Sequence, residues 1–72
     1  MPKKYFPLYK TNAGEVGRCI FRYNRTIDLE FLDGRMRSFH TEAITRIRRP
    51  TRLQIREWTR YLENKSLLAR LM

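Results

Sequence analysis

The amino-acid sequence predicts an α+β domain, a small antiparallel meander of three or four strands followed by one C-terminal helix. Three observations indicate this fold class: apolar residues alternate along two segments before residue 33, Asp33-Gly34 follows them as a hairpin signal, and a helical period begins after Pro50. The chain has 72 residues, which is enough for one small core. We therefore expect a single domain over residues 15–72, preceded by an N-terminal arm over residues 1–14.

Two strands are predicted over residues 16–23 and 27–32, because apolar side chains recur at every second position in each segment. A three-residue turn at residues 24–26 puts both apolar sets on one face of the sheet and pairs Phe21 with Leu29. A two-residue turn would instead place Phe21 opposite an acidic residue and direct one apolar set toward water. The parity of the pattern therefore favours the three-residue turn.

Asp33-Gly34 is the strongest local turn signal, because this dipeptide is typical of a two-residue type I′ hairpin. Such a hairpin pairs Phe31 with Met36 on the inner face and Glu30 with Arg37 on the outer face. We expect the outer face to neutralise itself through exposed ion pairs among Asp28, Glu30, Arg18, Arg22 and Arg37.

The third strand begins at Arg35, but its alternation is lost near residues 38–40. A bulge there, or a turn through residues 40–42 into a short fourth strand at residues 44–48, would restore the pattern. We favour the turn, and this choice decides between three strands and four.

The C-terminal helix is predicted to begin directly after Pro50, where Thr51 and Gln54 have the spacing of a capping box. The Thr51 hydroxyl can accept a hydrogen bond from a free helix N–H group, and Gln54 can reach back to the cap. At about 100° of rotation per residue, one face of the helix carries three apolar side chains that we assign to the core, namely Ile55, Trp58 and Leu62.

A break in this helix is predicted at residues 64–66, where Asn, Lys and Ser follow one another. Residues 67–72 contain three leucines and one methionine that do not continue the core face. Two interpretations stay open: a final turn that folds back to cap the core, or an exposed apolar tail that contacts a partner or a second copy of the chain.

The net charge of +9 and the isoelectric point near 10.6 are the strongest global signals. Self-repulsion of this size is typical of proteins that bind an anionic partner. Nucleic acid and an acidic protein surface fit this charge, whereas a membrane does not, because the chain has no run of about 18 apolar residues. Lys3-Lys4 leads into an aromatic cluster and not into an apolar leader segment, so we expect a cytoplasmic protein.

The positive charge is concentrated between residues 46 and 60, which include six arginines and one acidic residue. Arg52, Arg56 and Arg60 recur at every fourth position, so they repel one another along the predicted helix unless an anion lies beside them. Arginine binds phosphate and carboxylate through a fixed fork of donors. We predict that nucleic acid or an acidic partner binds at Arg46, Arg48, Arg49, Arg52, Arg56 and Arg60.

The N-terminal arm has aromatic and apolar residues on both sides of Pro7. It can cover an open edge of the sheet as an irregular strand, or it can stay exposed and dock on a partner. In the second interpretation the docking side chains are Tyr5, Phe6, Leu8 and Tyr9.

No catalytic site is predicted. Cys19 and His40 are the only residues of their kind, and neither lies in a recognisable nucleophile or metal-ligand motif. A single cysteine also excludes an internal disulfide, and we interpret Cys19 as a small buried apolar side chain. We expect no enzymatic activity, no metal, no cofactor and no small-molecule substrate.

The Asp33-Gly34 hairpin, the Arg48-Arg49-Pro50-Thr51 junction and the amphipathic helix together resemble the small Sm-like and SH3-like RNA-binding barrels, although the binding signatures of those families are missing. In size, charge and its Tyr5-Phe6-Pro7-Leu8 opening, the whole chain is similar to the small basic regulators that bacteriophages encode to reprogramme host transcription, in particular the antitermination proteins of Xanthomonas phages. This resemblance implies binding to bacterial RNA polymerase near the RNA exit channel, inhibition of initiation and read-through of terminators in the host cytoplasm.

The leading prediction is therefore a non-enzymatic transcription regulator that binds bacterial RNA polymerase, with nucleic acid nearby. A free-standing RNA- or DNA-binding module is the second prediction. The third is a structural or assembly protein that uses its apolar C-terminal tail.

Overall fold

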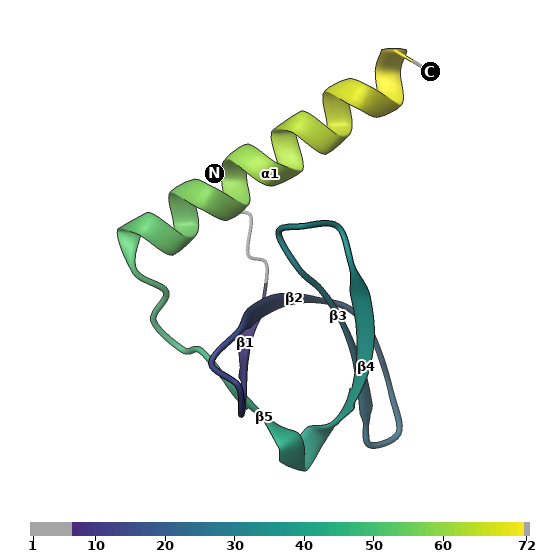
Figure 1. Cartoon of the computed structure of the whole chain (residues 1–72), viewed down its shortest axis with the longest axis vertical. Helices are drawn as coiled ribbons and strands as arrows, with labels where there is room; N and C mark the ends of the chain where they lie inside the picture. The colour runs from purple at the N-terminus through teal and green to yellow at the C-terminus, as the bar shows by residue number, and fades with distance from the viewer. Residues whose placement is uncertain (1–6, 72) are drawn as a thin grey trace.

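The structure is a computed structural model that describes residues 7–71. It contains five strands, a short 3-10 helix and one α-helix (Figure 1). The elements in chain order are β1 (Leu8–Thr11), β2 (Val16–Tyr23), β3 (Thr26–Glu30), β4 (Met36–His40), η1 (Thr41–Ala43), β5 (Ile44–Arg46) and α1 (Arg52–Leu71). The predicted α+β class, a strand meander with one C-terminal helix, is confirmed.

The strands form one sheet in the order β4-β3-β2-β1-β5, and every neighbouring pair is antiparallel. The sheet curls into a small barrel-like ring, which is seen from its open side in Figure 1. β1 lies between β2 and β5, and it is the strand that was not predicted from the sequence. It comes from residues that the sequence placed in the N-terminal arm, and it is held on both sides: the Cys19 amide donates to the Pro7 carbonyl at 2.9 Å, and the Ile47 amide donates to the Leu8 carbonyl at 2.8 Å.

The predicted register of β2 and β3 is wrong. The turn has two residues, because Tyr23 pairs with Thr26 and Phe21 pairs with Asp28. Asn24 adopts a φ of 51°, the left-handed region that asparagine tolerates better than most residues. A register shift between Cys19 and Phe21 then pairs Cys19 with Leu29, which returns Cys19 to the face of the apolar side chains. One extra residue in β2 therefore reverses the parity on which the three-residue turn was predicted.

The predicted register of β3 and β4 is also wrong by one residue, since Glu30 pairs with Met36 and Leu29 pairs with Arg37. The loop between these strands is closed by a hydrogen bond from the Phe31 amide to the Arg35 carbonyl, at 2.9 Å. Its last residue, Gly34, has a φ of 90°, which glycine adopts without strain. The loop therefore holds three residues, although the expected glycine still makes the turn.

The segment after β4 follows the favoured interpretation, a turn into a further short strand. The turn is η1, and the ring nitrogen Nδ1 of His40 accepts a hydrogen bond from the Glu42 amide at 3.2 Å. β5 then pairs with β1, from Thr11 opposite Ile44 to Tyr9 opposite Arg46. The strand is shorter than predicted, because regular pairing ends at Arg46.

The main core cluster lies on the inner face of the curled sheet. It consists of five buried side chains, which are Tyr9, Ile27, Leu29, Phe31 and Ile44. Cys19 and Phe39 are half-buried and pack against this cluster, which agrees with the interpretation of Cys19 as an apolar side chain. The rings of Phe31 and Phe39 meet edge to face, with their centroids 6.2 Å apart.

The start of α1 is confirmed in detail. The Gln54 amide donates to the Thr51 hydroxyl at 3.1 Å, and the Thr51 amide donates to the Gln54 side-chain oxygen at 2.9 Å. The two bonds together form a complete capping box. The predicted break at residues 64–66 is wrong, because α1 continues to Leu71.

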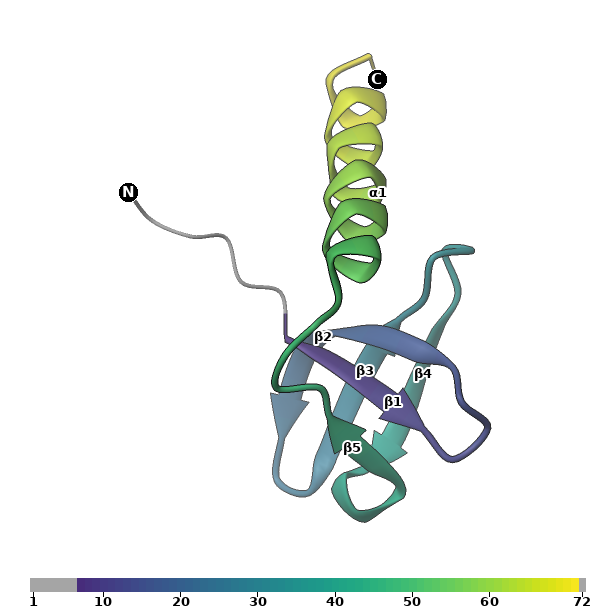
Figure 2. The same cartoon turned by 90° about the vertical axis from the view of Figure 1, so that its left-hand side faces the viewer.

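The core face of α1 is only partly as predicted. Trp58 is 1% exposed and Leu62 is half-buried, but Ile55 is 46% exposed. The helix is rotated so that Tyr61 and Lys65 face the sheet and Ile55 does not. Figures 1 and 2 show that α1 crosses one side of the barrel and that its C-terminal part projects beyond it.

The projecting part of α1 contains the apolar C-terminal residues. Leu67 is 55% exposed and Leu68 is 62% exposed, so these two side chains do not fold back to cap the core. Their exposure agrees with the interpretation of this segment as an exposed apolar tail.

Candidate anion-binding interface

The six arginines between Arg46 and Arg60, here called the arginine segment, extend from the barrel into the helix. Arg46 ends β5, two arginines lie in the connection between β5 and α1, and three lie on α1. The connection can be followed in Figure 1 as the green trace that leaves β5 and enters the helix. Every side chain of the set is exposed, namely Arg46, Arg48, Arg49, Arg52, Arg56 and Arg60.

The arginine segment is not neutralised by carboxylates within residues 7–71. Four ion pairs occur in this part of the chain, and all use cations outside the segment: Arg18–Glu30, Lys65–Glu30, Arg35–Asp33 and Arg35–Glu15. Arg46 makes a contact of another kind, with its guanidinium 5.9 Å from the centroid of the Tyr9 ring. The charge concentrated here in the sequence therefore remains exposed after folding.

The arginines of α1 face away from the barrel. Arg56 and Arg60 lie two positions on either side of the buried Trp58, which places them about 160° away around the helix axis. Arg52 precedes Arg56 by about one turn and lies beside it. The helix thus presents Trp58 to the protein and three arginines to solvent.

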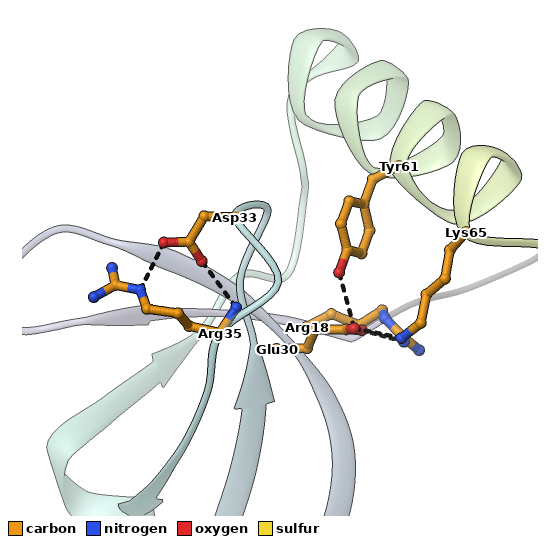
Figure 3. A network of polar contacts seen from close by, with 6 residues as sticks. All are labelled: Arg18, Glu30, Asp33, Arg35, Tyr61 and Lys65. Carbon is orange, nitrogen blue, oxygen red and sulfur yellow. Dashed lines mark hydrogen bonds and ion pairs between the residues drawn. The ribbon is translucent and has the colours of Figure 1, made fainter. Parts of the chain in front are cut away.

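Glu30 connects the sheet to α1 through polar contacts, which Figure 3 shows. This carboxylate is 3% exposed and accepts hydrogen bonds from Arg18 at 2.5 Å, from Lys65 at 2.5 Å and from the Tyr61 hydroxyl at 2.9 Å. Arg18 comes from β2, directly opposite Glu30 in the sheet, whereas Tyr61 and Lys65 come from α1. The Tyr61 ring also packs edge to face on Trp58, with the centroids 5.4 Å apart. One buried acid therefore ties the helix to the sheet.

The protonation behaviour of this cluster follows from its surroundings. Burial by itself raises the pKa of Glu30, but the hydrogen bonds from Lys65, Arg18 and Tyr61 outweigh it, so the pKa lies below its ordinary value. The pKa of Tyr61 is raised, first by burial and then by its hydrogen bond to the Glu30 carboxylate. At neutral pH the site therefore holds a carboxylate anion and a neutral tyrosine.

The predicted self-neutralised outer face of the sheet is wrong in most of its pairs. Arg22 lies opposite Ile27, because the turn between β2 and β3 has two residues instead of three. Arg37 places its guanidinium over the Phe39 ring, 5.2 Å from the centroid. The pair between Arg18 and Glu30 is present, but its acid is buried instead of exposed. Asp28, the other acid of the predicted pairs, accepts a hydrogen bond from the Ser38 hydroxyl at 2.6 Å.

Two of the four predicted docking residues are core residues, which corrects that prediction. Leu8 is fully buried and Tyr9 is 7% exposed, since β1 lies inside the sheet and not along its surface. Neither side chain therefore forms part of an exposed docking surface in this fold. Tyr5 and Phe6, the other two, lie outside the described residues.

Sequence reasoning missed an exposed aromatic pair. Phe21 is 58% exposed and Tyr23 is 45% exposed, and their ring centroids lie 5.2 Å apart. The parity argument assigned both side chains to the core, whereas the two-residue turn directs them outward. A signal was available in Asn24, because asparagine is favoured at the positive-φ positions of two-residue hairpins.

Between residues 7 and 71, no three or more His, Cys, Asp or Glu side chains are grouped so that they could hold a metal ion. α1 does not combine the length and the apolar content that a helix needs to cross a membrane.

Comparison with known proteins yields no match, whether to a family model, to a curated protein or to a solved structure.

Proposed function

We propose that this protein is a non-enzymatic transcription regulator that binds bacterial RNA polymerase through its arginine segment. One observation carries the proposal: the six arginines are exposed, and within residues 7–71 none of them pairs with a carboxylate. A basic surface that lacks acids of its own is suited to an acidic macromolecule, which it attracts over a distance and orients on contact.

The extent of the arginine segment favours a macromolecule over a small anion. Arg52 and Arg60 are separated by about 12 Å along the helix axis, because each residue rises about 1.5 Å. The arginines of the connection continue this surface toward the barrel. A partner that covers all of them must present negative charge over a wide area. Arginine can grip carboxylate and phosphate equally well through its paired donors.

RNA polymerase suits this description in one respect, because it holds nucleic acid and so carries phosphates beside its protein surface. The resemblance of the whole chain to small phage regulators supports the same partner, and it implies inhibition of initiation and read-through of terminators. We place the activity in the bacterial cytoplasm on these grounds. The regulator would act by binding alone, without catalysis.

The second candidate function is a free-standing RNA- or DNA-binding module. The exposed Phe21–Tyr23 pair favours it, since unpaired bases stack on exposed aromatic rings. In this case the arginine segment binds phosphates, and no polymerase is required. The two candidates share the arginines and differ in what remains bound after nucleic acid is removed.

A pull-down from bacterial lysate separates the two candidates. Tagged protein is incubated at moderate salt with and without nuclease, and retained proteins are identified by mass spectrometry. Retention of polymerase subunits after nuclease treatment is expected for the regulator. Loss of all polymerase with nuclease, together with recovery of nucleic acid without it, would replace the first proposal by the second.

A matched pair of variants tests the role of the arginine segment. Polymerase retention should fall strongly when three helix arginines are neutralised (Arg52→Gln, Arg56→Gln and Arg60→Gln). A control with the same loss of charge elsewhere should retain it (Lys10→Gln, Arg25→Gln and Arg70→Gln), since these three exposed residues lie outside the segment. Equal retention by both variants would remove the segment from the binding site. Urea unfolding of both variants verifies that each is folded.

Transcription in vitro tests the regulatory part of the proposal. A template with one promoter and one terminator is transcribed by purified polymerase with and without the protein. The proposal expects fewer initiated transcripts and a larger share that passes the terminator. Unchanged transcription at saturating protein would contradict a regulator.

A further inference from the structure

A hollow of about 520 Å³ opens on the barrel next to β2, η1 and β5. The β2–β3 turn and η1 lie on the side of the barrel away from α1, as both views show (Figures 1 and 2). Three arginines line the hollow, and they come from β2, from β5 and from the connection that follows it: Arg22, Arg46 and Arg48. Its volume is in the usual range of small-molecule sites.

Arg22 reaches the hollow because the two-residue turn pairs it with Ile27, while the register shift in β2 keeps Cys19 on the same inner face. In a regular strand that kept Cys19 on the inner face, alternation would direct an aromatic side chain to the inner face at this level and Arg22 to the outer face. With the shift, Arg22 lies opposite the buried Ile27. Bulges are often found where a strand must redirect one side chain toward a site. This bulge exchanges an apolar side chain for a cation at the open side of the core.

The hollow combines positive charge with an apolar floor. Ile27 and Ile44 are 2% and 8% exposed, and both line it. No carboxylate is among its lining residues, and within residues 7–71 none of its three arginines forms an ion pair. Tyr9 adds an aromatic ring beside the Arg46 guanidinium, 5.9 Å from its centroid.

The walls of the hollow are held together before any ligand binds. The Thr41 amide donates to the Arg25 carbonyl at 2.9 Å, which ties η1 to the β2–β3 turn. On the other side, β5 is paired along its length with β1. The backbone of such a site loses little conformational entropy when a ligand enters, and the ordering is confined to side chains.

These features define the ligand. Three guanidinium groups select an anion that offers several acceptor oxygens, as phosphate does. Tyr9, Ile27 and Ile44 are almost wholly buried, so they offer a small apolar floor against which a ring attached to that anion can rest. We propose that the hollow binds a nucleoside phosphate, either as a free nucleotide or as one nucleotide unit of a single-stranded nucleic acid.

This proposal goes beyond the proposed function and can fail separately from it. Arg46 and Arg48 belong to both surfaces, but Arg22 lines only the hollow, and Arg56 and Arg60 lie only on the helix. Substitutions at Arg22 therefore report on the hollow. Substitutions on α1 report on the interface with polymerase.

Titration of the ¹⁵N-labelled protein by NMR, at physiological ionic strength, tests the proposal. The probes are AMP, adenosine, inorganic phosphate and a short oligoadenylate. Saturable shifts of the Tyr9, Ile27, Ile44 and Arg46 amides are expected with AMP, none with adenosine, and weaker binding with inorganic phosphate. Tighter binding of the oligoadenylate at the same amides would identify a strand as the source of the nucleotide, and equal binding would identify the free nucleotide. No saturable shift, or phosphate binding as tight as AMP binding, overturns the proposal.

A charge-matched pair of variants completes the test. Arg22→Gln removes one hydrogen-bonding cation from the hollow and is expected to weaken AMP binding by at least about tenfold. Arg25→Gln removes the same charge from the neighbouring turn, outside the hollow, and is expected to leave binding within about twofold, as exposed charges contribute little. If the two substitutions weaken AMP binding equally, the binding reflects general charge attraction and the proposed site is overturned. Amide spectra of both free variants verify the fold.

Discussion

The Glu30→Gln substitution tests whether one buried carboxylate holds α1 on the barrel. A hydrogen bond that involves a charged group contributes about 1.5–3 kcal/mol. The Arg18 side chain is only 22% exposed, so its hydrogen bond to Glu30 keeps most of this energy. The Lys65 side chain is 55% exposed, so its pair with Glu30 contributes about 1 kcal/mol or less. Glutamine keeps an oxygen acceptor but loses the charge, so we expect a loss of about 2–3 kcal/mol. That is a large part of the stability of a domain of this size.

Urea unfolding followed by the fluorescence of Trp58 measures this loss, since Trp58 is the only tryptophan and is buried. The matched control is Glu63→Gln, which removes the same charge from an exposed position of α1 that forms no ion pair within residues 7–71. The control is expected to stay within about 0.5 kcal/mol of the wild type. If the two variants unfold at the same urea concentration, Glu30 does not anchor the helix and the reasoning is refuted.

Three further predictions concern stability. Because the pKa of Glu30 is lowered from its ordinary 4.5, its contribution to the free energy of unfolding is complete above that pH and is lost as the pH falls through the lowered value. In urea unfolding at a series of acidic pH values, the wild type should therefore lose stability more steeply than Glu30→Gln. Parallel curves for the two proteins would contradict this. In Gly17→Ala the new Cβ would lie 3.0 Å from the Leu29 Cβ and 3.2 Å from the Glu30 carbonyl oxygen, and unfolding in urea should show a loss of about 1–3 kcal/mol, so an unchanged midpoint would be inconsistent with this packing. Thr51→Ala removes half of the capping box with Gln54 and should cost about 1 kcal/mol in thermal unfolding followed by circular dichroism, whereas a neutral effect would show that the cap is dispensable.

The features that short-range chemistry determines were predictable from the sequence. Thr51 and Gln54 form the capping box that their spacing indicates, and α1 begins where Pro50 ends the preceding segment. Trp58 is buried as its place in the helical period required. In each case the interacting groups lie within a few residues of one another, so the pattern contains the whole interaction.

The strand registers were not predictable by the same reasoning. Parity assumes that both strands are regular, and the single extra residue of β2 breaks that assumption between Cys19 and Phe21. The alternation of Cys19, Phe21 and Tyr23 then indicated one face, although the structure divides these residues between two faces. A bulge of this kind is selected by tertiary packing, which local alternation does not report.

The surroundings of Glu30 depend on tertiary structure in the same way. In the sequence, Glu30 is one acid of an alternating strand, and nothing nearby indicates that a helix more than thirty positions later covers it. Because Tyr61 and Lys65 reach this acid, α1 turns Ile55 outward and continues through the predicted break. The hollow was missed for a related reason, since the two-residue turn and the bulge together place Arg22 and Cys19 on the inner face.

The exposure of the arginine segment was predictable, because its cations greatly outnumber the acids near them in the sequence. Only Glu57 lies among the six arginines, and the structure uses other acids for its ion pairs. Charge alone did not identify a partner for this surface, since arginine binds both carboxylate and phosphate.

The salt dependence of binding to purified bacterial RNA polymerase tests the central claim most directly. Kd is measured over a range of salt concentrations for the wild type and for the variant that carries Arg52→Gln, Arg56→Gln and Arg60→Gln. If the arginine segment binds the polymerase, the variant binds more weakly and its log Kd rises less steeply with log salt, because fewer ionic contacts are made. The same Kd and the same slope for both proteins would contradict the claim.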